Sequence, residues 1–521
     1  MKIKILIITL ILSINANAQP TIQWQKCLGG TSFEGATSIQ QTTDGCYIVS
    51  GYASSSDGAV TGLHGLVSMD YWIVKIDSLG AIKWQKCLGG TDIELARSIQ
   101  QTTDGGYIVA GKAWSNNGDV TGNHGGSDYW VVKLDSIGII QWQKCLGGNA
   151  YEEASSIKQT TDGGYIVAGN SSSNNGDVTG NHGGGDYWIV KLDNIGDIEW
   201  QKCLGGKDEE SAASIQQTTE GGYIVAGYSK SNDGDVTGLH GTADYWIVKL
   251  DIVGEIEWQK CLGGTIAQLA SSIQQTTEGG YIVAGISFSN DGDVTGNHGG
   301  GDYWIVKLDK VGAIQWQKCL GGTSQDNASS IQQTADKGFI VAGNSSSNDV
   351  NVIGNKGGGD YWIVKLDSIG AIQWQKCLGG TDEESATSIQ QTNDGGCIVV
   401  GDSKSKDGDV TGNHTYRDYW IVKLSPRIGG GVGIKEPLIE ENSISIFPNP
   451  ANNQLTIYSS VVLDKEVTIS VINVFGETVQ TEIIVGSGNE QLMIKNLTAG
   501  IYFLQFKTKN GTVVKRFIKE F

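Results

Sequence analysis

One segment, Trp-Gln-Lys-Cys-Leu-Gly-Gly, occurs seven times, and this repetition limits the possible folds more than any other feature of the sequence. The second copy begins 60 residues after the first, and each later copy follows after 58 residues. Two further segments, Asp-Tyr-Trp and Tyr-Ile-Val-Ala-Gly or a close variant of it, also occur once in each of the seven repeats. A fixed period of this length is typical of repeat architectures, in which each repeat is one supersecondary unit.

Each repeat contains four segments with the character of β-strands. In the fourth repeat we predict strands at 213–218, 223–227, 245–250 and 256–262. The first two are joined by Thr-Glu-Gly-Gly, whose counterparts read Thr-Asp-Gly-Gly, and Asp-Gly is a strong hairpin signal because it tolerates positive φ. Two successive hairpins form a four-stranded antiparallel sheet, which must stack on its neighbours to bury both faces. The sequence therefore predicts an all-β fold, a seven-bladed β-propeller.

The two ends of the repeat array predict how the ring closes. The array begins with a lone fourth strand at 22–28 and ends with a lone third strand at 419–424, and elsewhere these two strands are hairpin partners. If the N-terminal strand completes the last blade, no sheet edge is left exposed. We therefore expect a closed propeller over residues 19–424.

The layout of the repeat resembles that of kelch propeller blades, in which a strand ending in glycine precedes a strand with Tyr and Asp and then an outer strand with Trp. It differs in having one glycine, not two, after Tyr-Ile-Val-Ala. The resemblance implies that the Ser-Ile-Gln-Gln-Thr strand lines the central channel and that the Trp-Gln-Lys-Cys strand is outermost. Strand alternation places the long loop, as at 228–243, on the same face as the acidic connection between blades, and long loops on a rigid scaffold commonly carry function.

The N-terminus reads as a signal peptide over residues 1–18. Two lysines precede an apolar run at 5–14, and Ala-Asn-Ala at 16–18 is a cleavage pattern, so we expect the mature chain to begin at Gln19. The run is too short to span a bilayer, and no other segment is apolar enough to do so. The formal net charge of −19 argues against a nucleic-acid binder.

After the repeats, residues 425–442 read as a linker and residues 443–521 as a small all-β domain, a sandwich. This domain resembles the C-terminal sorting domain of cargo for the type IX secretion system of Bacteroidetes. The resemblance rests on Phe447-Pro448-Asn449-Pro450-Ala451, Val474-Phe475-Gly476, Leu497-Thr498-Ala499-Gly500-Ile501-Tyr502 and Val514-Lys515-Arg516-Phe517. It implies that the secretion machinery and its sortase are partners, and that the protein is secreted or lies on the outer cell surface.

The long loops contain Asn-Asp-Gly-Asp-Val-Thr-Gly or a close relative, which allows two interpretations. Alternating oxygen ligands around a glycine resemble part of a calcium loop, and calcium takes six to eight oxygens. Asn, Asp and Gly are also the residues that most commonly form turns. If calcium is a cofactor here, the candidate ligands are Asp119, Asp177, Asp233, Asp235, Asp291, Asp293, Asp407 and Asp409.

Two other residue types recur, cysteine in all seven repeats and histidine in six of them. Six histidines lie in the long loops, and we expect exposed loop residues because a ring holds equivalent loops too far apart to share a metal ion. Seven cysteines occupy one strand position, where we expect small, buried, apolar side chains that are too far apart to bridge. Cys46 and Cys397 depart from the repeat and fall in blades that closure makes neighbours, so pairing between them is left open.

One tryptophan, Trp114, lies outside the repeated segments, in the long loop of the second repeat. It is a candidate for stacking on a sugar or a peptide, and the alternative is an incidental surface aromatic. No Gly-x-Ser-x-Gly, Walker-type or His-Glu-x-x-His motif is present in the sequence. We therefore expect a monomeric binding propeller, not an enzyme, with polysaccharide or protein bound at the long-loop face. The alternative is a secreted glycan-active hydrolase or lyase.

Overall fold

The computed structural model describes residues 19–65, 68–426, 444–459, 467–473, 478–484, 489–508 and 511–520. The chain divides into two compact units, one over Asn17–Ile428 and one that includes Gly429–Phe521, and each is described by itself. The predicted signal peptide and most of the predicted linker lie outside the described residues. No helix within the described residues is long and apolar enough to cross a membrane.

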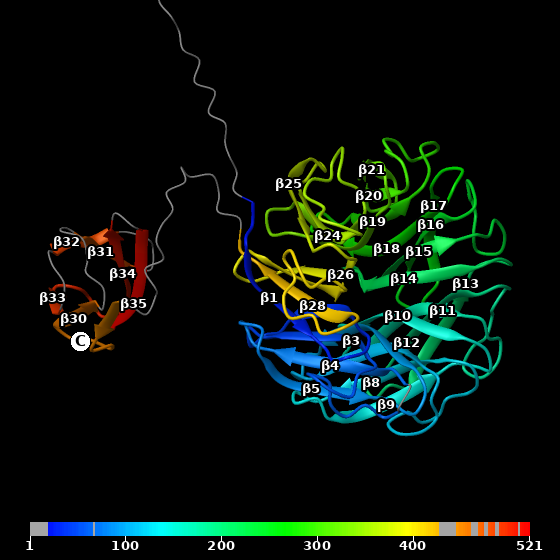
Figure 1. Cartoon of the computed structure of the whole chain (residues 1–521), viewed down its shortest axis with the longest axis horizontal. Helices are drawn as coiled ribbons and strands as arrows, with labels where there is room; N and C mark the ends of the chain where they lie inside the picture. Colours follow the sequence, from blue (N-terminus) through cyan, green and yellow to red (C-terminus); the bar gives the residue numbers. More distant parts are fainter. Residues whose placement is uncertain are drawn as a thin grey trace, which may run out of the picture. The chain divides into compact units, whose positions relative to one another are not determined.

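The first unit is a ring of seven four-stranded antiparallel sheets, which follow one another around a common centre (Figure 1). The innermost strands are β2 (Glu34–Gln41), β6 (Glu94–Gln101), β10 (Glu152–Gln159), β14 (Glu210–Gln217), β18 (Gln268–Gln275), β22 (Asp326–Gln333) and β26 (Glu384–Gln391). The second strands are β3 (Tyr47–Ala53), β7 (Tyr107–Ala113), β11 (Tyr165–Ser171), β15 (Tyr223–Ser229), β19 (Tyr281–Ser287), β23 (Phe339–Ser345) and β27 (Cys397–Ser403). The third strands are β4 (Asp70–Ile76), β8 (Asp128–Leu134), β12 (Asp186–Leu192), β16 (Asp244–Leu250), β20 (Asp302–Leu308), β24 (Asp360–Leu366) and β28 (Asp418–Leu424). The outermost strands are β5 (Ile82–Leu88), β9 (Ile140–Leu146), β13 (Ile198–Leu204), β17 (Ile256–Leu262), β21 (Ile314–Leu320), β25 (Ile372–Leu378) and β1 (Ile22–Leu28).

The predicted closure is confirmed. The last blade has the order β1-β28-β27-β26, so its outermost strand comes from the start of the ring (Figure 1). Ile22 pairs with Leu424 and Leu28 with Tyr419, and the Ser425 amide donates a hydrogen bond of 2.9 Å to the Thr21 carbonyl beyond them. The strand order also confirms that the Ser-Ile-Gln-Gln strand is innermost and the Trp-Gln-Lys-Cys strand outermost.

The Tyr and Trp of each Asp-Tyr-Trp segment join neighbouring blades. Consecutive residues of a strand point to opposite faces of the sheet, so one ring packs toward each neighbour. Tyr187 and Trp246, from adjacent blades, are both fully buried with ring centroids 4.5 Å apart. The Tyr187 hydroxyl donates to the Trp246 carbonyl (2.9 Å), and Trp246 Nε1 donates to Gln259 Oε1 (2.9 Å). The same contact crosses the closure, where the Tyr419 hydroxyl donates to the Trp72 carbonyl.

The sixth blade departs from the repeat at a turn that requires left-handed backbone. Val350 has a φ of 54°, whereas the other six blades have glycine at this position. A β-branched residue is strained there, at a cost on the order of 1–3 kcal/mol.

We therefore predict that Val350→Gly raises the free energy of unfolding by about 1 kcal/mol, because relief of strain exceeds the added entropy of the unfolded chain. Lys337→Gly, at a φ of 65° in the same blade, is the matched control and should give a smaller gain because lysine is not β-branched. Calorimetric melting of the full chain measures both. A lower melting temperature for Val350→Gly would contradict the prediction.

The second unit is the small β domain expected from the sequence. One sheet has the order β29 (Ile444–Phe447), β30 (Gln454–Ser459), β33 (Asn489–Met493), and the other has the order β32 (Thr478–Ile484), β31 (Val467–Asn473), β34 (Gly500–Thr508), β35 (Gly511–Lys519). Both sheets contribute to one buried cluster that includes Leu455, Val471, Leu504 and Phe517.

The Pro-Asn-Pro-Ala segment binds the last strand of this domain. Asn449 Nδ2 donates to the Arg516 carbonyl (3.1 Å), and Asn449 Oδ1 accepts from the Ile518 amide (2.9 Å). The Ala451 amide donates to the Ile518 carbonyl (2.8 Å). The motif that carries the family resemblance therefore has a structural function in joining the start of the domain to β35.

Candidate functional site

The residues that differ most between the seven blades gather where the innermost strand begins and the second strand ends, beside the long loop. We call this set the variable rim, and it comprises five positions per blade: those of Phe33, Gly35, Tyr52, Ser54 and Arg417. At the first of them the other blades carry Ile93, Tyr151, Glu209, Ala267, Gln325 and Glu383. At the fourth they carry Trp114, Ser172, Lys230, Phe288, Ser346 and Lys404.

The sheet registers bring the five positions together. Gly35 is the cross-strand partner of Tyr52, and the Ser54 amide donates to the Phe33 carbonyl (3.0 Å). Phe33 also forms a parallel bridge with Arg417 of the preceding blade. Each blade junction therefore presents one cluster of side chains that can vary without disturbing the blade core.

Aromatic rings are prominent on the variable rim. Phe33 stacks across the closure on Tyr416, the residue before rim residue Arg417, with ring centroids 4.9 Å apart, and the two side chains are 43% and 53% exposed. Trp114 is half-buried, with the Lys112 ammonium 4.6 Å from its ring centroid. Phe288 occupies the same position in the fifth blade. The sequence analysis identified Trp114 but not Phe288 or the Phe33–Tyr416 pair. An alignment of the seven repeats, compared position by position, could have found these aromatic residues.

Ion pairs are the other component of the variable rim. Glu153 accepts from Lys112 (2.6 Å) and from Arg97 (2.7 Å), which lies on β6 beside the rim, and this links the second and third blades. Burial acts to raise the pKa of Glu153, but Arg97 and Lys112 together hold that pKa below its usual value. A second cluster joins Arg417 to Asp402 and Glu383. The rim thus offers aromatic faces beside fixed charges of both signs.

The predicted calcium ligands make hydrogen bonds to backbone in this structure. Asp291 accepts from the Thr265 amide (2.8 Å), and Asp293 accepts from the Gly263 amide (3.1 Å), so the loop is tied to the connection between blades. Equivalent backbone bonds are made by Asp119, Asp177, Asp233, Asp235, Asp407 and Asp409. Within the described residues, no three His, Cys, Asp or Glu side chains are arranged to hold a metal ion. Calcium stays a prediction, and the geometry gives these carboxylates a role in loop structure.

The loop histidines are more constrained than the sequence indicated. His182 Nδ1 lies 2.6 Å from Asp186 Oδ2, and this pairing recurs in all six blades that have the histidine. Asp186 is fully buried, and its other oxygen makes no hydrogen bond within the described part of the chain. Burial raises the pKa of Asp186, and the hydrogen bond that the His182 ring makes to Asp186 raises the pKa of His182.

A second buried acid accompanies each of these aspartates except Asp244, which has Gln268 beside it. The strand predicted at 213–218 leaves Glu210 in the acidic connection between blades, but Glu210 is the fully buried first residue of β14. Its two oxygens accept from the Gly206 amide (2.8 Å) and the Ser229 hydroxyl (2.7 Å). Asp186 and Glu210 both occupy the space that a side chain at Gly205 would need, which explains the glycine after each Trp-Gln-Lys-Cys-Leu. The loop interpretation was wrong because the strand begins three residues earlier than predicted, where these bonds satisfy the acid.

The repeated cysteines are confirmed as buried, with Cys27 alone partly exposed, and all nine thiols are free. Burial raises the pKa of Cys203 to about 12, so this thiol is unreactive at neutral pH. Cys46 and Cys397 do not form a disulfide.

Comparisons with known proteins identify the second unit. Residues 445–520 match the family described as the secretion system C-terminal sorting domain. Within 167 residues the chain is 26% identical to the regulatory protein FlaEY of Caulobacter vibrioides, a match that covers 28% of this chain and 17% of that protein. Among solved structures, Sqt1 from Chaetomium thermophilum is 11% identical, with a TM-score of 0.38, over 84% of this chain and 97% of its own. The Neurospora crassa Pan2 WD40 domain is 10% identical, with a TM-score of 0.36, over 82% and 91%.

The family match and the sheet topology support separate conclusions. The sorting domain shows that the chain is exported, to a secreted or outer-surface location. The order of the seven sheets and the β1–β28 pairing show that the first unit is a closed propeller.

Proposed function

We propose that this propeller, exported through the type IX secretion system, binds an extracellular polysaccharide at its variable rim and acts as a binding protein, not as an enzyme. The observation that carries the proposal is the contrast between rim and core. Near-identical blades keep the same Tyr, Trp and Gly residues, yet the rim positions hold aromatic, aliphatic, acidic and basic side chains. A surface that only supported the fold would not need such different side-chain types at equivalent positions.

The chemistry of the variable rim suits a sugar polymer. Trp114, Phe288 and the Phe33–Tyr416 pair belong to different blade junctions, so an extended chain could contact several of them. Aromatic faces stack on the apolar faces of sugar rings, and the adjacent ion pairs supply donors and acceptors for hydroxyl groups. Aromatic side chains of this kind are the usual energetic anchors of a binding surface.

The chain itself supplies a conservative test. Trp114→Ser with Phe288→Ser places at both positions the serine that the first, third and sixth blades already carry, so the fold should tolerate the change. We expect affinity for polysaccharides on a glycan array to fall by about 100-fold, at ~1.4 kcal/mol per lost aromatic contact. Ile137→Ser removes a 58% exposed side chain from a turn on the other face and is the control.

Three outcomes would contradict the proposal. Unchanged glycan binding by the double serine variant would exclude the variable rim. No binding of the wild-type chain to any glycan would exclude polysaccharide and favour a protein ligand. Turnover of a bound glycan would favour the hydrolase or lyase alternative.

A further inference from the structure

The seven innermost strands line a central channel with a volume of about 450 Å³. Its walls carry serine, isoleucine and glutamine from equivalent positions, and no acidic side chain lines it among the described residues. Six blades place a glutamine near the end of the innermost strand: Gln40, Gln100, Gln216, Gln274, Gln332 and Gln390. The third blade has Lys158 there, which is the one charged residue of the lining.

The six glutamines form an almost complete hydrogen-bonded ring. Each side-chain oxygen accepts from a backbone amide of the next blade, as Gln100 Oε1 does from the Gln159 amide (2.7 Å). Across the closure, Gln390 Oε1 accepts from the Gln41 amide (2.6 Å). The other four links have distances of 2.6 to 2.9 Å. Because every oxygen is used as an acceptor, the amide nitrogens remain as donors, and they make no hydrogen bond within the described part of the chain.

Lys158 breaks this ring at one point. A lysine side chain has no acceptor, so the Gln217 amide of the next blade lacks the bond that its six counterparts have. The Lys158 ammonium has no ion pair among the described residues, and burial lowers its pKa. A cation in a confined channel without a counter-charge is costly, so the site favours an anion beside it.

We infer that the channel binds a small oxyanion, such as a carboxylate, sulfate or phosphate, between the Lys158 ammonium and the amide N–H groups of the glutamine ring. Each of these anions presents several oxygen acceptors to a ring whose side-chain oxygens already accept from backbone amides and whose amide N–H groups are left as donors. The site differs from the variable rim, because the rim lies where the innermost strand begins and the glutamine ring lies near its end. Anion binding in the channel can therefore be present or absent whatever the outcome for polysaccharide binding at the rim.

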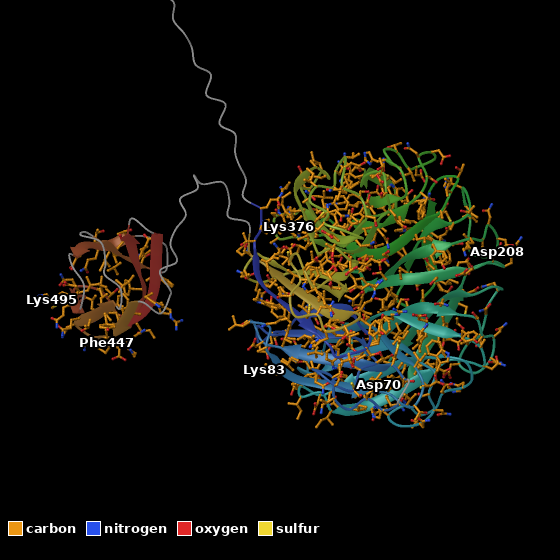
Figure 2. The ribbon with its side chains drawn as sticks, viewed as in Figure 1. Asp70, Lys83, Asp208, Lys376, Phe447 and Lys495 are labelled. Atoms are coloured by element: carbon orange, nitrogen blue, oxygen red, sulfur yellow. The ribbon has the colours of Figure 1, made fainter. Side chains whose placement is uncertain are left out.

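The first experiment is isothermal titration of the full mature chain with sodium acetate, sulfate and phosphate in separate arms. We expect at least one of them to bind with a stoichiometry of one. Lys158→Gln should weaken that binding at least tenfold. This variant makes the third blade like the other six and supplies the acceptor that the Gln217 amide lacks, so it should fold. Lys83→Gln, at the periphery of the ring in β5, is the control for loss of a positive charge (Figure 2).

The pseudo-symmetry of the ring allows a rescue that a merely structural lysine would not show. In Lys158→Gln with Gln332→Lys, the lysine moves to the sixth blade and faces the same channel. We expect this double variant to recover binding to within about threefold of wild type. Absence of binding by the wild-type chain to all three anions would overturn the inference, as would full binding by Lys158→Gln. Failure of the double variant to recover binding would also overturn it, because the ring would then not form the site.

Discussion

Deletion of residues 19–28 is expected to open the ring and to lower the melting temperature of the propeller by at least about 5 °C. The deletion removes β1, which supplies the outermost strand of the last blade. It leaves the outer edge of β28 unpaired, while β27 still pairs with the other edge, and it exposes the apolar cluster to which Ile22 and Cys27 contribute. Loss of several partly buried apolar side chains and one strand ladder costs on the order of 5 kcal/mol. We also expect concentration-dependent association, because an open sheet edge can pair with another chain.

The control for this deletion moves the strand instead of removing it. In the other blades, the third and fourth strands are joined by a five-residue turn, as at Asp367–Ala371 between β24 and β25. The permuted chain begins at Gly29. After Leu424 it continues through a copy of this turn into the sequence of β1, so its last blade has an ordinary hairpin. We expect it to melt within about 2 °C of the wild type. If the deletion and the permuted chain melt alike, β1 does not close the ring.

The features predictable from the sequence are those set by local patterns repeated seven times. Alternating apolar residues and Asp-Gly turns predict four strands per blade, and the unmatched strands at the two ends predict closure. The predicted first and last residues of the strands are less accurate. The first strand of the fourth blade was expected at 213–218 but extends over Glu210–Gln217, since the sequence gives no sign that an acid such as Glu210 is buried.

The site was less predictable because its residues are defined by contacts between blades. Asp186 and Glu210 lie in different blades, and charged residues are seldom fully buried, so sequence patterns favour placing them at the surface. The Phe33–Tyr416 pair exists only because the ring closes and brings two ends of the chain together. By contrast, Trp114 could be singled out from the sequence because it departs from an otherwise regular repeat.

Mild acid is expected to stabilise the propeller. Burial raises the pKa of Asp302 to about 6 and that of Asp360 to about 7, and burial also raises the pKa of the equivalent aspartates in the other five blades. A carboxyl whose pKa is higher in the folded than in the unfolded state binds more protons when folded. Its contribution is therefore full below about pH 4 and is lost as the pH rises to about 7.

A second group of aspartates acts in the opposite direction at lower pH. Hydrogen bonds and ion pairs with Lys133 and Lys191 outweigh the effect of burial and lower the pKa of Asp104 and of Asp162 to about 2. Stability from these pairs is present above about pH 4 and is lost as the pH falls toward 2. Thermal melting from pH 3 to pH 8.5 at constant ionic strength should therefore show a maximum at about pH 4–5. A melting temperature that rises steadily from pH 5 to pH 8 would contradict this.

Asp360 should dominate the alkaline side of this profile. Its blade has Lys356 in place of histidine, and the Lys356 ammonium pairs with Asp409, so Asp360 lacks the ring donor that the other six aspartates have. Asp360→Asn is expected to stabilise the chain at pH 8 by on the order of 2–4 kcal/mol, because the pKa of Asp360, about 7, lies well above the usual aspartate value and each tenfold change in proton affinity is worth about 1.36 kcal/mol. At pH 3, where the carboxyl is protonated in both the folded and the unfolded chain, the gain should nearly vanish.

The chain's net charge makes a matched control necessary, because removing any negative charge from a protein at −19 reduces self-repulsion. Asp208→Asn removes an exposed charge at the edge of the ring and changes the net charge equally (Figure 2). It should shift the melting temperature little at either pH. Lys356→His restores the ring donor of the other blades and should also raise stability at pH 8, because it lowers the pKa of Asp360. If Asp208→Asn and Asp360→Asn stabilise equally at pH 8, the pH dependence arises from overall charge and not from the buried carboxyl.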